Sequence, residues 1–138
     1  MNIFLTGATG FIGKKFLLLA LNKGHFIFAL TKKNQKFKHI NLKWLKGPIT
    51  KKWNYELKNT DVIVHLASVG VRNINISYSE AKKFNVTNSL SLFRNAAINK
   101  CNKWIIAGSV SEYGVSCVGK NKINIKTKAK PETVYEKT

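Results

Sequence analysis

The stretch that decides the fold is NIFLTGATGFIG, residues 2–13 of a chain of 138 residues. Its first part, Asn2–Leu5, is largely apolar and predicts a buried strand. That strand runs directly into three glycines with the spacing G-x-x-G-x-x-G, and apolar residues then recur at helical spacing from Phe11 to Asn22. A strand, a glycine turn and a helix in this order predict the first part of a βαβ unit.

Apolar periodicity predicts two helices. The first covers residues 11–22 and ends at the helix stop Lys23-Gly24, and the second is a long helix over residues 79–100. We expect each helix to pack on the core through its apolar stripe. The stripes are Phe11, Ile12, Phe16, Leu19 and Ala20 in the first helix, and Val86, Leu90, Phe93 and Ala97 in the second.

Short apolar runs predict the remaining strands. The runs lie at residues 25–30, 42–45, 62–67 and 103–107, while 53–57 fits a short helix or turn and 31–39 and 115–130 fit loops. A continuous apolar run such as 62–67 is typical of a parallel strand that is covered on both faces, so we expect its one histidine, His65, to pack in the core. The alternation of strands and helices predicts an α/β fold, a Rossmann-type doubly wound parallel sheet, as a single domain over residues 1–138.

Composition and charge restrict the class of protein. The chain is 44% hydrophobic and 22% charged, which fits a folded globular domain. Its net charge of +18 comes almost entirely from scattered lysines. Arginine, which is better suited to bidentate phosphate and base contacts, is rare, so we predict no specific nucleic-acid partner. A steeply salt-dependent affinity for DNA or RNA would favour that alternative.

The sequence also bears on location and redox state. The apolar start lacks a preceding basic segment and is too short to span a bilayer, so we predict a cytoplasmic protein with no membrane partner. Cys101 and Cys117 have no metal-ligand spacing, and no metal site is predicted. Reduced thiols are the simpler expectation, and a disulfide between them stays open.

The glycine turn predicts a dinucleotide site. Gly7 permits a tight turn out of the strand, Gly10 lets a pyrophosphate approach the backbone, and Gly13 lets the helix pack close to the sheet. The start of the helix offers free amide groups and a partial positive charge to the phosphates. The other predicted cofactor contacts of this segment are Thr9, Phe11 and Ile12.

The end of the second strand bears on the choice between NAD and NADP. An acidic residue there holds the ribose 2′-hydroxyl of NAD, whereas a basic one suits the 2′-phosphate of NADP. This chain has Thr31-Lys32-Lys33 and no acid nearby. We therefore predict NAD(P) binding through Thr31 and Lys32, with NADP slightly favoured. In a chain so rich in lysine, the same pair also fits ordinary surface residues.

Taken together, several segments resemble the motifs of the extended short-chain dehydrogenase/reductase family, which contains epimerases, dehydratases and reductases of nucleotide sugars. The resemblance extends over essentially the whole chain, and the motifs occur in the family's order. The matching segments are Thr6–Gly13, Asp61–Ser68, Asn85-Val86, Ile105–Gly114 and Pro131–Tyr135.

The resemblance implies roles for further residues. Ser109 falls on the catalytic serine/threonine position, and Tyr135 on the general acid/base. The tyrosine is expected to exchange a proton with the sugar oxygen while hydride moves to or from the nicotinamide. The additional cofactor contacts implied by the resemblance are Leu66, Ala67, Ser68 and Asn85.

The implied activity is an NAD(P)-dependent epimerase or 4-keto-reductase of a nucleotide-activated sugar. Val110 and Ser111 stand where the 4,6-dehydratases carry an Asp-Glu pair, which argues against that reaction. The family's lysine would follow Thr138, so we expect an incomplete domain, truncated before the C-terminal substrate domain. A homodimer is compatible with the full-length parent. The alternative is a noncatalytic NAD(P)-binding module or pseudoenzyme.

Overall fold

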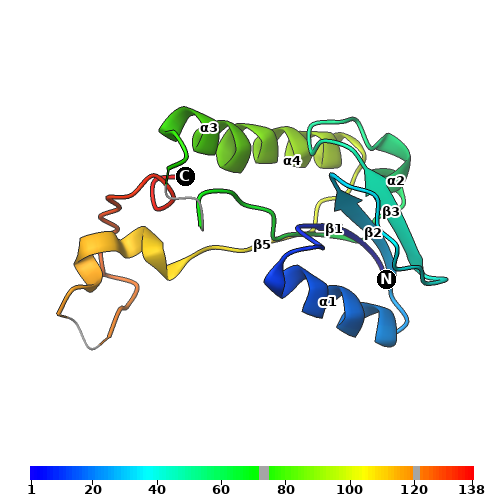
Figure 1. The fold of residues 1–138 in the computed structure, drawn as a ribbon, viewed down its shortest axis with the longest axis horizontal. Helices are drawn as coiled ribbons and strands as arrows, with labels where there is room; N and C mark the ends of the chain where they lie inside the picture. Colours follow the sequence, from blue (N-terminus) through cyan, green and yellow to red (C-terminus); the bar gives the residue numbers. More distant parts are fainter. Residues whose placement is uncertain (72–74, 120–121) are drawn as a thin grey trace. The chain divides into compact units, whose positions relative to one another are not determined.

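The computed structural model describes residues 1–71, 75–119 and 122–138. The chain divides into two compact units, each made of two segments (Figure 1). The first unit comprises Met1–Ala67 and Thr87–Ala107. The second comprises Ser68–Val86 and Gly108–Thr138.

The first unit is built on a parallel five-stranded sheet with the strand order β3-β2-β1-β4-β5. Every neighbouring pair is parallel, and in the central pair Thr6 lies opposite His65. This confirms the predicted Rossmann-type α/β class. The strands are β1 (Asn2–Thr6), β2 (Phe26–Thr31), β3 (Leu42–Lys46), β4 (Val62–His65) and β5 (Trp104–Ile106).

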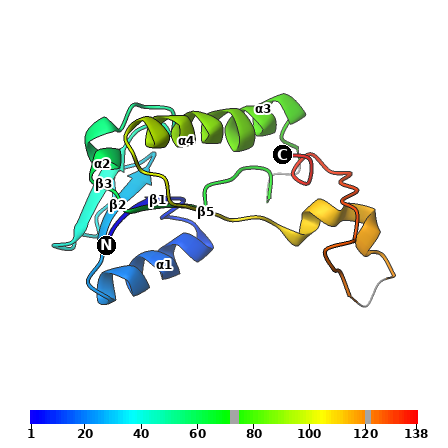
Figure 2. The same ribbon diagram turned by 180° about the vertical axis from the view of Figure 1, so that it is seen from behind.

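Helices lie on both faces of this sheet and bury its central strands, whereas the three residues of the edge strand β5 are exposed. Helix α1 (Phe11–Asn22) lies on one face, and α2 (Asn54–Lys58) and α4 (Ser89–Ile98) lie on the other, as the opposite views of Figures 1 and 2 show. Neighbouring strand residues point to opposite faces. Ile3, Leu5 and Ile27 therefore pack with α1, whereas Phe4 and Ile63 pack with α2 and α4.

The buried face of α1 differs from the predicted stripe. Its buried residues are Gly13, Leu17, Ala20 and Leu21, while Phe11, Ile12 and Leu19 are exposed. The helix is apolar on several sides, so periodicity alone does not select a face. The selection comes from Gly13, whose missing side chain allows the closest approach to the turn after β1.

The predicted long helix is interrupted. Helix α3 (Tyr78–Lys82) in the second unit continues into a π-helical segment, Lys83–Asn88, before α4 begins in the first unit. The buried residues of α4 are Ser89, Leu92, Phe93 and Ala96, so Leu90 and Ala97 of the predicted stripe are exposed instead. A π segment contains one more residue per turn than an α-helix, which accommodates a stripe displaced by one position.

The second unit has less regular structure. A 3-10 segment, η2 (Val110–Cys117), extends into the predicted loop 115–130, of which residues 120–121 lie outside the described chain. Gly114 interrupts this segment with a φ of 49°. A Cβ at Gly114 would collide with the carbonyl of Lys130. Glycine is therefore required where the chain around residue 114 passes the segment that contains Lys130.

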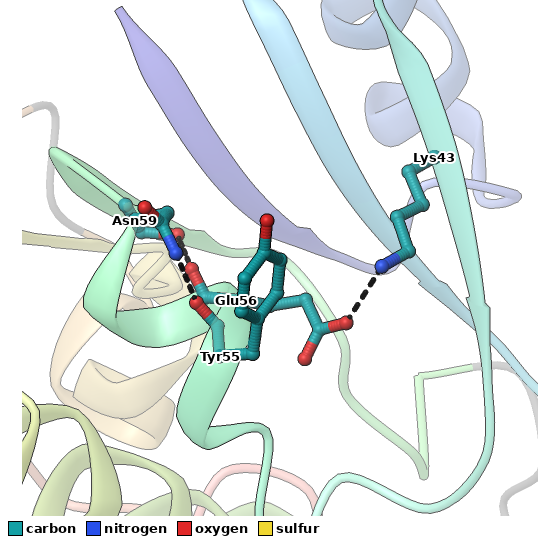
Figure 3. A network of polar contacts seen from close by, with 5 residues as sticks. Lys43, Tyr55, Glu56 and Asn59 are labelled. Carbon is teal, nitrogen blue, oxygen red and sulfur yellow. Dashed lines mark hydrogen bonds and ion pairs between the residues drawn. The ribbon is translucent and has the colours of Figure 1, made fainter.

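A polar contact joins β3 to α2 in the first unit (Figure 3). The Lys43 ammonium lies 3.0 Å from a Glu56 carboxylate oxygen and 5.4 Å from the centre of the Tyr55 ring. Asn59 then closes the helix by donating its side-chain amide to the Tyr55 carbonyl at 2.7 Å. Because Lys43 is half exposed, the ion pair contributes about 1 kcal/mol or less, and burial of Leu57 is the larger attachment.

The α2 attachment is tested by Leu57→Ala. Leu57 is fully buried in the cluster on the α2 and α4 face. We expect the substitution to lower the free energy of unfolding by about 2–5 kcal/mol, because it removes buried methylenes and leaves a cavity. The measurement is denaturant unfolding. The matched control is Leu19→Ala on the exposed side of α1, with an expected change within about 0.5 kcal/mol. Equal losses in the two variants would contradict the packing described.

Candidate functional site

The strand order places a switch in direction beside β1. The chain passes from β1 to β2 and β3 on one side and then crosses back to β4 on the other side. Ligands of open parallel sheets bind in the crevice that such a switch leaves at the carboxyl ends of the strands. That edge carries three predicted segments: the glycine turn after β1, Thr31-Lys32 at the end of β2, and Leu66-Ala67 after β4.

Glycine is required by contact at two positions of the turn. Gly7 has a φ of +73°, and a Cβ there would lie 2.8 Å from the amide nitrogen of Ala67. A Cβ at Gly13 would collide with the Gly7 carbonyl. Gly10 is different, because its Cβ would meet only the Gly7 carbonyl oxygen, at 3.2 Å. The fold itself therefore requires glycine at positions 7 and 13. At Gly10 the absence of a side chain instead leaves the backbone of the turn accessible to a ligand.

The start of α1 presents unsatisfied backbone donors. The first bond of the helix runs from the Lys14 amide to the Gly10 carbonyl at 3.0 Å, so the amides of residues 11–13 precede it. Gly10 is the N-cap and has no side chain with which to cap them. The side chains of Phe11 and Ile12 are 83% and 63% exposed beside these amides. The amides at this end of the helix can bind an anionic group, and the exposed Phe11 and Ile12 side chains can contact an apolar part of the same ligand.

Thr31 organises the turn after β2. Its buried hydroxyl donates to the Lys33 carbonyl at 2.9 Å and accepts the Lys33 amide and the Gln35 side-chain amide, each at 3.2 Å. The hydroxyl therefore holds the loop in shape, and the exposed side chains of Lys32 and Lys33 supply the positive charge.

A polar network lies under the turn and was not predicted as a unit. The Thr6 hydroxyl oxygen is 2.8 Å from His65 Nδ1, and His65 Nε2 is 2.9 Å from the Ser89 hydroxyl oxygen. All three residues are buried, which confirms His65 as a core histidine. The sequence contained a weak signal, since Thr6 and His65 both end adjacent apolar strands. Ser89, 24 positions further on, had none.

In the second unit, Asn85 holds the chain that follows β4. Its side-chain oxygen accepts the Val69 amide at 2.9 Å, and its side-chain nitrogen donates to the Val69 carbonyl at 3.0 Å. The same nitrogen donates to the Thr138 hydroxyl at 3.0 Å. The side-chain amide of Asn85 is therefore engaged with Val69 and Thr138 of the protein itself.

Ser109 and Tyr135 both lie in the second unit. Ser109 is the N-cap of η2, and its hydroxyl oxygen accepts the Ser111 amide at 3.2 Å. Tyr135 is half-buried and lies beside Gly70, within 3.5 Å of the position that a Cβ there would occupy. Among the described residues, no hydrogen bond joins Ser109 to Tyr135. A cavity of about 400 Å³ next to η2 is lined by Val110, Ser111 and Cys117 together with Glu132 and Glu136.

Other kinds of site are not found in the described part of the chain. Residues 1–71, 75–119 and 122–138 contain no group of three His, Cys, Asp or Glu side chains arranged to hold a metal ion. Within the same residues, no helix has the length and apolarity needed to cross a membrane. Cys101 and Cys117 are free thiols.

The strand order and the glycine turn define a Rossmann-type architecture, and comparison with known proteins gives the family. The model of the NAD-dependent epimerase/dehydratase family matches residues 3–138. The chain therefore belongs to this family, which confirms the resemblance seen in its motifs. No curated protein matches the chain in sequence.

Solved structures show the same fold. A structure of MoeE5 in complex with UDP-glucose and NAD is 24% identical, with a TM-score of 0.83 over 99% of this chain and 45% of that one. UDP-glucose 4-epimerase from Bifidobacterium longum, in complex with NAD+ and UDP, is 18% identical, with a TM-score of 0.77 over 99% of this chain and 45% of that one. The dTDP-glucose 4,6-dehydratase of Bacillus anthracis in complex with NAD is 21% identical, with a TM-score of 0.79 over 99% of this chain and 46% of that one. This chain thus spans less than half the length of these proteins.

Acid sensitivity follows from the buried histidine. Burial lowers the pKa of the His65 imidazole below its usual value, so the unfolded chain binds the proton more readily than the folded one. The stabilising effect of neutral His65 is complete above about pH 6.5 and declines as the pH falls from there towards the folded pKa. Unfolding measured between about pH 7 and pH 5 should therefore show a loss of stability that His65→Asn diminishes. In the control His39→Asn, at an exposed histidine, the loss should persist. Identical pH profiles for wild type and His65→Asn would contradict the assignment.

Proposed function

We propose that this chain binds NAD(P) and forms the cofactor half of an enzyme that epimerises or reduces a nucleotide-activated sugar. The observation that carries the proposal is the open glycine turn at the switch point between β1 and β4, in a chain whose family is that of the NAD-dependent epimerases and dehydratases. Nucleotide sugar and NAD together in the MoeE5 structure support this substrate class.

The cofactor is assigned to the edge of the sheet in the first unit. The pyrophosphate would approach the backbone at Thr9 and Gly10, where the amides at the start of α1 offer donors. The backbone of Leu66-Ala67 would line the other side of the crevice, with Ser68 following it along the chain. Phe11 and Ile12 would cover apolar parts of the ligand.

The chemistry is assigned to Ser109 and Tyr135. The bound nicotinamide supplies a hydride acceptor or donor for a sugar carbon. Because the Ser109 oxygen already accepts the Ser111 amide, its hydroxyl proton is available to hydrogen-bond the reacting sugar oxygen. The Tyr135 phenol would exchange a proton with the same oxygen.

NADP is the slightly favoured form of the cofactor. The turn held by Thr31 carries Lys32 and Lys33 at the end of β2, where a 2′-phosphate is recognised in this fold. The NAD in the structural relatives leaves NAD as the alternative.

The glycine turn provides a test in which binding and folding separate. Gly10→Ala should leave the fold nearly intact, since its Cβ needs a shift of only tenths of an ångström from the Gly7 carbonyl. It should still weaken the binding of NADH and NADPH by about tenfold or more, because the methyl group blocks the pyrophosphate. Isothermal titration calorimetry measures the affinities, and circular dichroism measures the fold.

Two controls accompany Gly10→Ala. Gly108→Ala, which meets open space, should change neither property. Gly13→Ala should impair folding itself, because its Cβ collides with the Gly7 carbonyl. A folded wild-type protein that binds neither dinucleotide would refute the proposed function.

Lys32→Glu tests the NADP preference. Replacing a charge-assisted contact to the 2′-phosphate with a repulsion should weaken NADPH binding by about tenfold or more and change NADH binding by about twofold or less. The control is Lys103→Glu, which alters the net charge equally but precedes β5 at the opposite edge of the sheet. Parallel losses for NADPH and NADH would argue against recognition of the 2′-phosphate by this turn.

A further inference from the structure

The Thr6 hydroxyl is a buried junction between the two backbone segments of the crevice. Thr6 is the last residue of β1, immediately before Gly7, and is 0% exposed. Its hydroxyl oxygen lies 3.2 Å from the amide nitrogens of both Leu66 and Ala67 and 2.8 Å from His65 Nδ1. The Leu66 amide is shared with the Thr6 carbonyl, at 3.3 Å.

The donors and acceptors at this junction favour one tautomer of His65. Two backbone amides donate to the Thr6 hydroxyl oxygen, one of them shared with the Thr6 carbonyl, which leaves the hydroxyl proton for His65 Nδ1. Nδ1 therefore carries no proton. A neutral imidazole then carries its proton on Nε2, which donates to the Ser89 hydroxyl oxygen at 2.9 Å.

The junction lies beside a close contact between two backbone segments. Gly7 and the Leu66-Ala67 backbone are so close that a Cβ at Gly7 would lie 2.8 Å from Leu66 C and Ala67 N. The Thr6 hydroxyl joins the residue before Gly7 to those two amides, and His65 determines in which direction that hydroxyl points. We expect a change at His65 to alter the spacing of the two turns.

We propose that His65, as the neutral Nε2–H tautomer, is a positioning residue that holds the glycine turn against Leu66-Ala67 through the Thr6 hydroxyl and so sets the width of the dinucleotide crevice. The inference rests on the proposed function for its ligand. In this proposal His65 influences dinucleotide binding without contacting the dinucleotide itself.

Protonation of His65 opposes this arrangement. A proton on Nδ1 would point at an oxygen whose lone pairs already accept two amides. The described groups around the ring are uncharged: Thr6, Ser89, the Phe93 ring at 5.4 Å, and Ile106, the neighbour of His65 in β5. Acidification thus breaks the link without providing a replacement partner, consistent with a pKa that burial lowers.

Two amide substitutions divide the histidine's functions between them. In His65→Asn the side-chain oxygen takes the place of Nδ1 and accepts from Thr6, whereas in His65→Gln the side-chain nitrogen takes the place of Nε2 and donates to Ser89. We expect His65→Asn to keep the NADH and NADPH affinities within about twofold of wild type and His65→Gln to weaken them by about tenfold. Both variants should lose thermal stability, so stability alone does not predict the difference in affinity.

A second pair tests the junction from its other side. Thr6→Val removes the hydroxyl at nearly constant shape and should weaken dinucleotide binding by about tenfold. Thr6→Ser keeps the hydroxyl and should bind the dinucleotides within about twofold of the wild-type affinity. Affinities that follow thermal stability in all four variants, with no difference between Asn and Gln at position 65, would overturn the proposal.

A spectroscopic measurement keeps the inference independent of the ligand. In nitrogen-15 NMR of the wild-type protein at neutral pH, His65 should show an unprotonated Nδ1 and a protonated Nε2. The amide resonances of Leu66 and Ala67 should shift in His65→Gln and stay close to wild type in His65→Asn. A protonated Nδ1 would refute the positioning role. If these signals are as expected but neither NADH nor NADPH binds, the proposed function fails while the link between the two turns stands.

Discussion

The contact between the Gly7 carbonyl and the backbone of Gly13 is the constraint on which the rest of the first unit depends. Because no side-chain atom fits at Gly13, α1 lies as close to the turn after β1 as two backbones permit. This closeness selects the helix face that carries Leu17 and Leu21 for burial. It also turns the amides of the helix start towards the carboxyl edge of the sheet, so one steric contact determines both the packing of α1 and the direction of these amides.

The sequence predicted what local sterics determine and missed what depends on distant partners. Glycine spacing and apolar runs gave the strands, the parallel α/β class and the position of the turn. The buried face of α1 was mispredicted because Phe11 and Leu19 are as apolar as the residues that are buried. The link from His65 to Ser89 spans 24 positions and needs the sheet and α4 to be assembled before its two members meet.

The polar residues of the site illustrate how a motif and a contact can differ. Asn85 and Thr31 were both predicted from the sequence as cofactor contacts. In the structure, their side chains are engaged in shaping Val69 and the Lys32-Lys33 turn, respectively. A crevice lined by backbone, as in the proposed dinucleotide site, would explain this pattern. When amides make the binding surface, the informative side chains are those that hold the backbone in place, and they lie behind it.

The π segment between α3 and α4 has a consequence for how such a chain changes over generations. A π turn is what an α-helix becomes when it acquires one residue and keeps its ends helical. In an uninterrupted α-helix, one extra residue rotates everything beyond it by about 100° and would turn a buried stripe towards solvent. The six-residue π segment Lys83–Asn88 can absorb an added residue, so that the helix beyond it keeps its orientation. Asn85 lies inside the segment, so a gain or loss of one residue there would change the direction of the side chain that holds Val69 and would leave the packing of Leu92 and Phe93 unchanged.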